Sequence, residues 1–376
     1  MKPKETLGVA MIGQGFMGRA HSNAFQQVNR FFDTPYDLKR KVVCGRDPIR
    51  LKDMASRWGW DETETQWQAA IERKDIQVVD IAAPNNLHAE IAIAAAKAGK
   101  IVLCEKPLAR SLGEARRMAE ATQRVPNLVW FNYRRVPAVA LAKSIVEEGR
   151  LGQIYHYRAT YLQSWGVSRG VDGWRFNRSE AGSGVVGDLL AHLVDTALLL
   201  NGRILELSGV THTFVEGREV DDAVLLHARF ENGSIGTLEA TRFAIGCQNQ
   251  NTFEIHGSGG MIRFNLEDLN HLEFFDADGS PRLQGVSEIL VTNPDHPYVR
   301  HFWPPGHIIG YEHTFIATIA DFLNTLASGD PFHANFQDAL EVQRVLDAAE
   351  ESSRRRSWLT LSLEQVLSGS GDDRLA

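Results

Sequence analysis

A glycine-rich segment near the N-terminus constrains the fold of this chain more than any other part of the sequence. Three glycines within residues 13–18 follow the apolar run 7–12 and precede a stretch with helical periodicity. A strand, a G-x-G-x-x-G turn and a helix in this order are typical of a doubly wound α/β domain that binds a dinucleotide. The backbone N–H groups and the dipole of such a helix N-terminus bind a pyrophosphate. The loop residues that we expect to contact the dinucleotide are Gly13, Gly15, Phe16, Met17 and Gly18.

Short apolar runs alternate with helical stretches throughout the first third of the chain. This alternation predicts βαβ units around a parallel sheet. The predicted strands are residues 7–12, 41–44, 77–82, 101–104 and 128–131, and the predicted helices are residues 17–28, 49–58, 87–99 and 112–123. We therefore predict an α/β fold whose N-terminal domain, residues 1–132, is a Rossmann domain with a doubly wound parallel sheet.

The hydrophobic periodicity changes to two after about residue 150, which is typical of strands. The predicted strands are residues 153–163, 207–215, 224–230, 234–243 and 252–255, with hairpin turns at 231–233 and 258–260 and helices at 185–200, 309–327 and 336–354. This pattern predicts a C-terminal α+β domain, residues 133–376, with an open, mostly antiparallel sheet. We expect helix 137–148 to join the two halves and the C-terminal helix to pack back on the first domain. A chain of 376 residues is also long enough for two cores.

The composition is that of a soluble globular protein and excludes several classes of partner. A formal net charge of −7 and a pI near 6.0 give no electrostatic footprint for nucleic acid. No apolar run approaches the roughly 20 residues that cross a bilayer, and we see no signal peptide, so we expect a cytoplasmic protein without a membrane partner. The three cysteines, Cys44, Cys104 and Cys247, match neither a zinc motif nor a disulfide framework. Four histidines between residues 296 and 313 have no acidic or cysteine partner at ligand spacing, so we expect no metal.

The end of the second predicted strand bears on which dinucleotide binds. An acidic residue at this position binds the ribose hydroxyls of NAD, but this chain has Gly45, followed by Arg46 and Asp47. Arg46 is placed to meet the 2′-phosphate of NADP, whereas Asp47, two residues later, is still within reach of the ribose. The sequence therefore predicts NAD or NADP as the cofactor and favours NADP on the strength of one residue.

Three titratable residues form the candidate catalytic set. Lys106, in a Glu-Lys-Pro motif, follows a predicted parallel strand, at the edge where open α/β sheets bind ligands. Asp188 and His192 are four residues apart in a predicted helix and project from one face, one turn apart. A histidine oriented by a carboxylate beside an ammonium accepts the proton of an alcohol near neutral pH. The alternative is an ion pair on a helix surface; the glycine-rich residues 181–184 and the otherwise apolar helix favour a cleft.

With these residues in place, the chain resembles the Gfo/Idh/MocA oxidoreductase family. The resemblance extends over nearly the whole length and rests on several motifs in the same order. These are the glycine loop, Ala83-Pro84-Asn85-Asn86-Leu87-His88, Glu105-Lys106-Pro107, Trp174-Arg175-Phe176, and Asp188 with His192. Within the family, segments 131–135, 161–163 and 303–307 are most similar to the levoglucosan dehydrogenase-like members.

The resemblance implies an NAD(P)-dependent enzyme that transfers hydride between nicotinamide and a secondary alcohol of a sugar, anhydrosugar or polyol. His192 would take the hydroxyl proton, Lys106 would polarise that oxygen, and Asp188 would orient the pair and the substrate. The further cofactor contacts that it implies are Ala83, Pro84, Asn85, His88, Glu105 and Lys106. The substrate contacts that it implies are Lys106, Tyr133, Arg134, Tyr161, Gln163, Trp165, Arg175, Asp188, His192 and His307. Family members often assemble through the second domain, so a homodimer or homotetramer is expected.

Two other functions fit the same residues. One is an NAD-dependent glycoside-cleaving enzyme that oxidises C3 transiently to permit elimination, and so releases an aglycone without net NADH. The other is a regulator that binds the dinucleotide without turnover, because a fold alone does not fix function. The complete set of Lys106, Asp188 and His192 favours catalysis over regulation.

Overall fold

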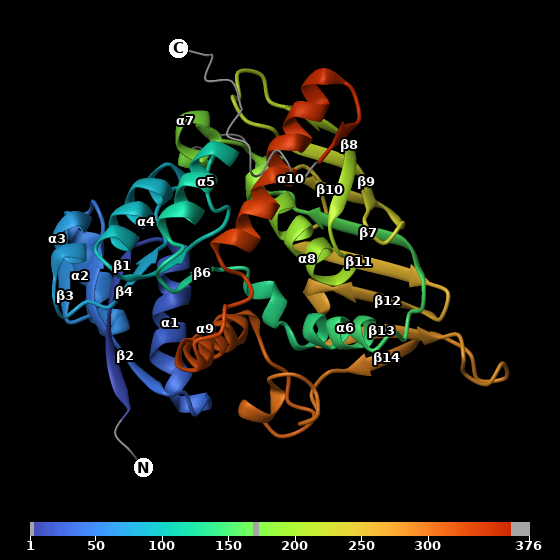
Figure 1. Ribbon diagram of the computed structural model, residues 1–376, viewed down its shortest axis with the longest axis horizontal. Helices are drawn as coiled ribbons and strands as arrows, with labels where there is room; N and C mark the ends of the chain where they lie inside the picture. Colours follow the sequence, from blue (N-terminus) through green and yellow to red (C-terminus); the bar gives the residue numbers. More distant parts are fainter. Residues whose placement is uncertain (1–3, 168–172, 362–376) are drawn as a thin grey trace.

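The computed structural model describes residues 4–167 and 173–361, which build two β-sheets with helices around them (Figure 1). The first sheet has the strand order β3-β2-β1-β4-β5-β6, and its neighbouring strands are parallel. This order is that of a Rossmann fold, which confirms the predicted doubly wound domain. Its elements are β1 (Glu5–Ile12), α1 (Phe16–Phe31), β2 (Tyr36–Cys44), α2 (Pro48–Trp58), β3 (Glu62–Glu64), α3 (Trp67–Glu72), β4 (Val78–Ile81), α4 (His88–Lys97), β5 (Ile101–Cys104), α5 (Leu112–Ala121) and β6 (Asn127–Val129).

Burial on both faces explains the apolar composition of the central strands. Val9, Ala10 and Met11 of β1 are completely buried. Two short elements were not expected from the sequence, namely β3 and α3. A three-residue polar edge strand and a six-residue helix show too little periodicity to be recognised. Strand β2 also begins at Tyr36, earlier than the predicted start at residue 41.

The second sheet has the strand order β14-β13-β12-β11-β7-β10-β9-β8-β15. Within the described residues β7 and β10 pair in parallel, and the other neighbouring strands are antiparallel. The mostly antiparallel sheet is thus confirmed, and both predicted hairpin turns join neighbouring strands. The strands are β7 (Ile154–Leu162), β8 (Ile204–His212), β9 (Ala223–Phe230), β10 (Ile235–Thr241), β11 (Gln250–Gly257), β12 (Gly260–Asn265), β13 (His271–Asp276), β14 (Ser287–Leu290) and β15 (Leu359–Thr360). Strands β12 to β15 were not predicted from the sequence.

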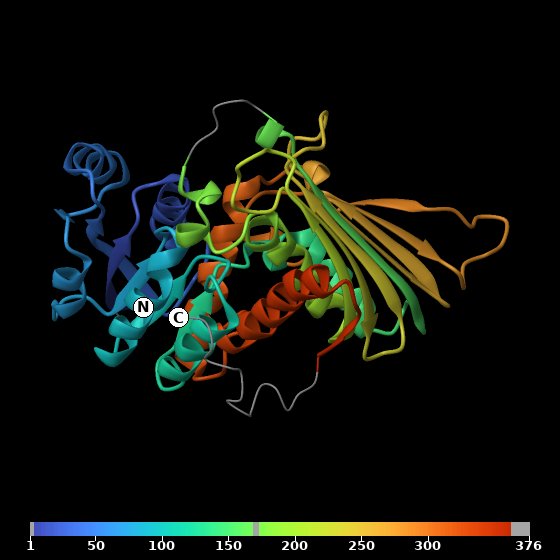
Figure 2. The same cartoon turned by 90° about the horizontal axis from the view of Figure 1, so that it is seen from above.

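Helices fill the space between the two sheets, as Figure 2 shows from above. The remaining helices are α6 (Pro137–Glu147), α7 (Arg178–Ala181), α8 (Ala191–Asn201), α9 (Tyr311–Ser328) and α10 (Phe336–Arg355). Helix α9 packs on α1, while α10 contacts α5 on one side and β8 on the other. Asp347 of α10 accepts a hydrogen bond from the backbone N–H of Leu112 at 2.7 Å. The C-terminal helix therefore packs on the layer of the first sheet, whereas the domain boundary at residue 132 stays a prediction.

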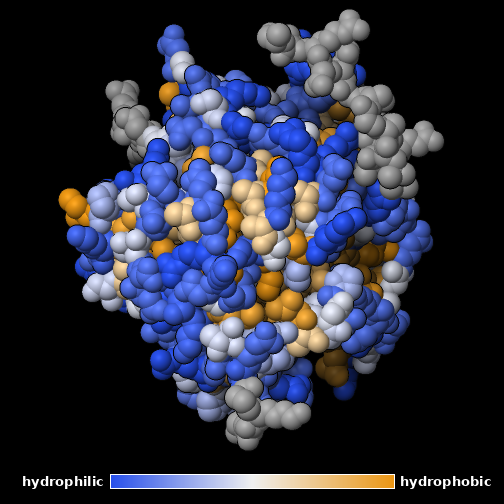
Figure 3. Space-filling model, turned by 60° about the vertical axis from the view of Figure 1, so that its left-hand side comes forward, coloured by the Kyte–Doolittle hydropathy of each residue, from blue (hydrophilic) through white to orange (hydrophobic). Residues whose placement is uncertain are grey.

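One helical stretch corrects an expectation about apolar segments. Residues Arg178–Asn201 are long and apolar enough, by length and composition, to cross a membrane. In the structure 78% of the most apolar window of this stretch is buried inside the protein, where α8 packs against α10 and β7. Figure 3 shows a face of the molecule on which hydrophilic side chains predominate around smaller apolar patches. The apolar character of α8 is that of a core helix.

Candidate active site

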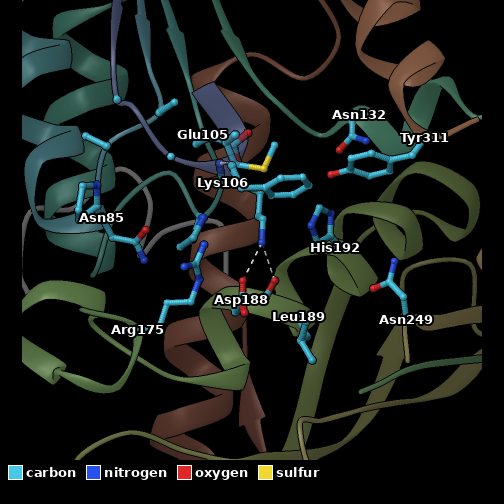
Figure 4. Close-up of a pocket in the computed structure, with 18 of the residues that line it drawn as sticks. Asn85, Glu105, Lys106, Asn132, Arg175, Asp188, Leu189, His192, Asn249 and Tyr311 are labelled. Carbon is cyan, nitrogen blue, oxygen red and sulfur yellow. Dashed lines mark hydrogen bonds and ion pairs between the residues drawn. The ribbon is translucent and has the colours of Figure 1, made fainter. Parts of the chain in front are cut away.

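A cavity of about 1510 Å³ is lined by residues from the layers of both sheets. Its walls come from the glycine loop after β1, the segments that follow β2, β4 and β5, the helical turn before α8, and the end of β7. Carboxyl ends of parallel strands are where open α/β sheets bind ligands. The close-up in Figure 4 shows side chains from the two layers pointing into this shared space.

The glycine loop fits a pyrophosphate. A Cβ on Gly13 would lie 2.3 Å from the carbonyl oxygen of Ala82, and a Cβ on Gly18 would lie 2.5 Å from the carbonyl oxygen of Gly13. These contacts allow α1 to pack closely on the loop. The space beside Gly15 is open, since no atom lies within 4 Å of the place of its Cβ. Gly15 is also the N-cap of α1 without a side-chain cap, which leaves the first N–H groups of the helix for an anion.

The predicted loop contacts differ in where they lie. Gly13, Gly15, Phe16 and Met17 line the cavity, whereas Gly18 does not. Gly18 lies behind the loop and acts on its packing. The loop residues that could contact a dinucleotide phosphate are therefore Gly13, Gly15, Phe16 and Met17, and their role as cofactor contacts stays a prediction.

The segment after β2 contributes Gly45, Arg46 and Asp47 to the wall of the cavity. Asp47 is the N-cap of α2, and its Oδ1 accepts hydrogen bonds from two backbone N–H groups of the first turn at 3.0 and 3.1 Å. The carboxylate that was expected to reach the ribose thus caps a helix, with Arg50 Nε at 3.4 Å. Arg46 is exposed and lines the cavity. A Cβ on Gly45 would lie 2.1 Å from Gln14 Oε1, so glycine at this position makes room for the buried amide.

The segment 83–88 joins the cofactor side of the cavity to the other layer. Its first three residues line the cavity, and Asn85 Nδ2 donates to the carbonyl oxygen of Ala181 at 2.9 Å. His88 is completely buried and does not line the cavity. Its ring nitrogens contact the carbonyl oxygen of Ala83 at 3.0 Å and that of Pro107 at 3.1 Å. Burial lowers the pKa of His88, and the contacts of its neutral ring fix the two loops to each other.

Lys106 reaches from the end of β5 across the cavity to the helical turn before α8. Its Nζ donates to the carbonyl oxygen of Asp188 at 2.7 Å and to Oδ1 of the same residue at 3.1 Å (Figure 4). The backbone N–H of Lys106 donates to Glu105 Oε2 at 3.1 Å. The carboxylate and the backbone carbonyl of Asp188, in the opposite layer, thus orient the ammonium.

Asp188 lies in a π-helical turn, Val186–Leu190, that leads into α8. Turns of this kind are rare and occur frequently at functional sites. The buried carboxylate of Asp221 accepts from the backbone N–H groups of Gly184 and Val186 at 2.6 and 2.8 Å, which fixes the start of the turn. The regular helix that was predicted from residue 185 is therefore widened where Asp188 lies.

The charges around Asp188 keep its carboxyl ionised. Arg242, which is 1% exposed, donates to Asp188 Oδ2 at 3.0 Å. Burial alone would raise the pKa of Asp188, but Lys106, Arg242 and Arg175 outweigh burial and hold this pKa far below its usual range. A carboxylate between three cations stays ionised near neutral pH and accepts hydrogen bonds from them.

His192 lies in the same cavity and is kept neutral. Burial and the ammonium of Lys106 hold the pKa of His192 well below its usual range, and Asp188 opposes this only in part. Within the described chain no hydrogen bond links Asp188 to His192, which differs from the expected carboxylate–histidine pair. The ring of His192 packs instead against Tyr133, with centroids 4.5 Å apart, and against Tyr161, with centroids 5.9 Å apart. A neutral imidazole held by aromatic rings can act as a proton acceptor.

Most of the predicted substrate contacts share this cavity. Tyr133, Tyr161, Gln163, Trp165 and Arg175 line it together with the catalytic set. His307 does not: its ring is exposed and its Nδ1 lies 3.0 Å from the carbonyl oxygen of Pro304. Arg134 is also elsewhere, because its guanidinium forms a buried ion pair with Asp195 at 2.6 Å. The proximity of residues 133 and 134 in sequence gave no way to tell which one faces the cavity.

Several residues that line the cavity were not predicted from the sequence. Arg242 lines the cavity. Asn249, Asn132 and Tyr311 line it as well (Figure 4). Arg242 follows β10 and Asn249 precedes β11, and each lies in a loop without a recognisable motif. Only the pairing of β7 with β10 and β11 brings these loops to the π-helical turn that contains Asp188.

A buried polar cluster beneath the Glu-Lys-Pro loop was also missed. The ring nitrogens of His21 lie 2.8 Å from Asp80 Oδ2 and 2.9 Å from Glu105 Oε1. Asp80 Oδ1 accepts from the indole N–H of Trp130 at 2.8 Å, and the indole stacks on the His21 ring. Burial lowers the pKa of His21, but Asp80 and Glu105 outweigh it and raise the pKa to about 9. A protonated imidazole between two carboxylates thus holds Glu105 in place. Glu105 in turn accepts a hydrogen bond from the backbone N–H of Lys106.

Comparisons with known proteins match both halves of the chain. Residues 7–133 match an oxidoreductase family with an NAD-binding Rossmann fold, and residues 139–263 match the GFO/IDH/MocA C-terminal domain. The chain is 40% identical to levoglucosan dehydrogenase of Pseudarthrobacter phenanthrenivorans, over 94% of this chain and 98% of that protein. The crystal structure of an oxidoreductase domain protein from Kribbella flavida is 45% identical with a TM-score of 0.93, covering 95% of this chain and all of that one.

A further similar structure bears on the cofactor. Levoglucosan dehydrogenase in complex with NADH and levoglucosan is 42% identical to the chain, with a TM-score of 0.92, over 95% of this chain and 99% of that one. The matched domains, the fold and the fit of the glycine loop agree on a nicotinamide dinucleotide as cofactor. The chain belongs to the Gfo/Idh/MocA family of NAD-binding oxidoreductases.

Proposed function

We propose that this oxidoreductase transfers a hydride between a nicotinamide dinucleotide and a secondary alcohol carbon of a sugar, anhydrosugar or polyol. The observation that carries the proposal is the convergence of Lys106 and Asp188 with His192 in one cavity that the glycine loop also lines. The levoglucosan dehydrogenases support a carbohydrate substrate. Aromatic rings and hydrogen-bonding side chains in the same wall suit the apolar faces and the hydroxyls of a sugar ring.

Each catalytic side chain has a role that its surroundings favour. His192 is neutral near pH 7 and takes the proton of the substrate hydroxyl during oxidation. Lys106 keeps donor capacity beyond its two bonds to Asp188 and donates to the same substrate oxygen as that oxygen becomes negative. Asp188 stays ionised between its cations and aims the ammonium. The bound nicotinamide ring supplies the hydride acceptor.

A substrate panel tests the proposal. The purified protein is incubated with sugars, anhydrosugars and inositols, each with NAD and with NADP, and the absorbance of the reduced nicotinamide is followed. We expect reduction of the dinucleotide with at least one anhydrosugar or pyranose. Release of an aglycone from a glycoside without net reduced nicotinamide would show the glycoside-cleaving alternative instead. Dinucleotide binding without turnover of any compound would favour the regulatory alternative.

We infer that the chain acts as a homodimer or homotetramer in the cytoplasm. The outer face of the second sheet supports the assembly, because Val210, Leu225 and Ile235 on adjacent strands are 50% to 60% exposed. Val210 and Leu225 pair directly across β8 and β9. Exposed apolar residues gathered on one sheet face are typical of an interface. Light scattering coupled to gel filtration measures the assembly, and a monomer at micromolar concentration would contradict the inference.

A further inference from the structure

A chain of hydrogen bonds follows the wall of the cavity from Trp165 to Tyr133. Trp165 Nε1 lies 2.6 Å from Gln163 Oε1, and Gln163 Nε2 lies 2.7 Å from Asn249 Oδ1. The hydroxyl of Tyr161 lies 2.8 Å from the same Asn249 oxygen and 3.1 Å from the hydroxyl of Tyr133. All five residues line the cavity, so the last hydroxyl of the chain lies beside the candidate substrate position.

The direction of this chain is fixed at one end. An indole N–H only donates, so the Gln163 atom that faces Trp165 must be the carbonyl oxygen. The other end of that amide is then an NH₂ group, which donates to its neighbour. The Asn249 atom that it meets must therefore be an oxygen acceptor, and the orientation of the second amide is fixed by the first.

The two tyrosines continue the same direction. Tyr161 donates its single proton to the Asn249 oxygen, so its own oxygen can only accept from Tyr133. The hydroxyl of Tyr133 then donates its single proton to the hydroxyl oxygen of Tyr161. Burial raises the pKa of Tyr133 to about 12, so the phenol stays neutral at the pH of an enzyme assay. The oxygen of Tyr133 keeps lone pairs and has no proton left for a ligand.

We propose that Tyr133 is a fixed hydrogen-bond acceptor for the substrate and that Trp165 is the residue that imposes this polarity through Gln163, Asn249 and Tyr161. The site thereby selects a polyhydroxylated substrate that presents a hydroxyl donor at this point and rejects one with an ether, a carbonyl or fluorine there. The ring of Tyr133 packs on His192 with centroids 4.5 Å apart, so the selected hydroxyl is a neighbour of the reacting one. This inference rests on the proposed function, since it concerns the hydroxyls of its substrate.

Deoxy and fluoro analogues separate a donor requirement from simple contact. The best substrate of the panel is compared with derivatives in which one hydroxyl at a time is replaced by hydrogen or by fluorine, and kcat/KM is measured. Fluorine resembles a hydroxyl in size but donates no hydrogen bond. At one position we expect both replacements to lower kcat/KM by about tenfold or more. In Tyr133→Phe, which leaves no acceptor, the same two analogues should match the parent sugar within about twofold.

A second variant tests the origin of the polarity. Trp165→Phe keeps an aromatic ring against the Arg242 guanidinium, which lies 4.7 Å from the indole ring, but removes the donor that fixes Gln163. We expect the fluorine penalty to shrink by about threefold or more while the parent sugar still turns over. Tyr157→Phe is the control, because Tyr157 lies on β7 with Tyr161 and its buried hydroxyl has no hydrogen-bond partner among the described residues. This control should keep the analogue pattern of the unaltered protein.

The possible failures are distinguishable. If the parent sugar is oxidised but fluorine is tolerated at every position, or if Tyr133→Phe keeps the penalty, the acceptor role of Tyr133 is wrong and the proposed function stands. If Trp165→Phe keeps the full penalty, the indole does not impose the polarity. If no sugar of the panel is turned over or bound, the proposed function fails, and the acceptor role fails with it.

Discussion

Lys106 Nζ lies 2.7 Å from the backbone carbonyl oxygen of Asp188 and 3.1 Å from its carboxylate, although the two residues are 82 positions apart. Lys106 lies just after β5 of the first sheet, and Asp188 lies in a π-helical turn beside the second. The ammonium therefore links the cofactor side of the cavity to the substrate side. Its replacement should affect chemistry more than dinucleotide binding.

We expect Lys106→Ala to lower kcat by about 10² or more and to change the Kd for the dinucleotide by less than about threefold. The reason is that in the proposed mechanism the ammonium donates to the reacting oxygen, whereas the phosphates are bound by backbone N–H groups. Steady-state kinetics and fluorescence titration of NADH measure the two quantities. Lys143→Ala, which removes an exposed lysine paired with Glu147 on α6, serves as control and should leave both unchanged. Normal turnover by Lys106→Ala would remove the lysine from the mechanism.

The pH profile should carry the signature of His192. Because the pKa of His192 is lowered, its imidazole is unprotonated and can act as a base at any pH above that lowered pKa. This basic function is lost only as the pH falls through the lowered pKa. For alcohol oxidation we expect kcat/KM to persist as the pH falls through 6.5, the ordinary imidazole value, with any limb from His192 lying lower. In His192→Asn we expect kcat/KM to fall by about 10² or more. The pH profile of this variant should no longer show the limb that belongs to His192. An acid limb at or above pH 6.5 that disappears in this variant would contradict the assignment.

His21 should make the stability of the protein depend on pH. Its pKa is raised from 6.5 to about 9 in the folded protein, so its contribution is complete below pH 6.5 and is lost as the pH rises through 9. The loss is on the order of 3 kcal/mol in the free energy of unfolding. Glu350, whose pKa is raised to about 7, titrates in the unaltered protein and in His21→Gln alike, so the difference between their slopes reports His21. Tm measured from pH 7 to 9 should fall more steeply in the unaltered protein than in His21→Gln.

The same experiment has an internal check. His256→Gln removes a histidine whose side chain is 44% exposed, and it should leave the pH dependence of Tm unchanged. His21→Gln should also lower Tm at pH 7, because Asp80 and Glu105 lose the cation between them. Equal slopes in the unaltered protein and in His21→Gln would show that His21 is not the titrating group.

Arg46 should decide how well the protein binds NADP. We expect Arg46→Ala to weaken NADPH binding by about tenfold more than NADH binding, because only NADPH carries a 2′-phosphate for the guanidinium. Fluorescence titrations with both dinucleotides measure the difference. Arg57→Ala is the control, since Arg57 lies on the exposed side of α2 in an ion pair with Asp53. Equal losses for the two dinucleotides would mean that Arg46 contacts neither 2′ substituent.

Local sequence determined the first half of the fold and the parts of the site that belong to motifs. The spacing of Gly13, Gly15 and Gly18 requires only a strand, a turn and a helix that are adjacent in the chain. Lys106 could be assigned because the end of a parallel strand is a functional position in any open α/β sheet. Asp188 and His192 were found because polar residues in an apolar helix are conspicuous. Each of these signals is contained within a few residues.

Only the tertiary structure decided what these residues contact. Asp188 bonds Lys106 and Arg242 instead of His192, because a π-helical turn and the parallel pairing of β7 with β10 bring those cations to it. Arg242 and Asn249 lie in loops without a local pattern, and His307 shows that a motif residue need not reach the cavity. Periodicity and motifs record the geometry of neighbours in the chain, whereas strand pairing and layer packing join residues that are distant in sequence. The proposed catalytic groups come from two such layers, so their arrangement could be read only after both layers were placed.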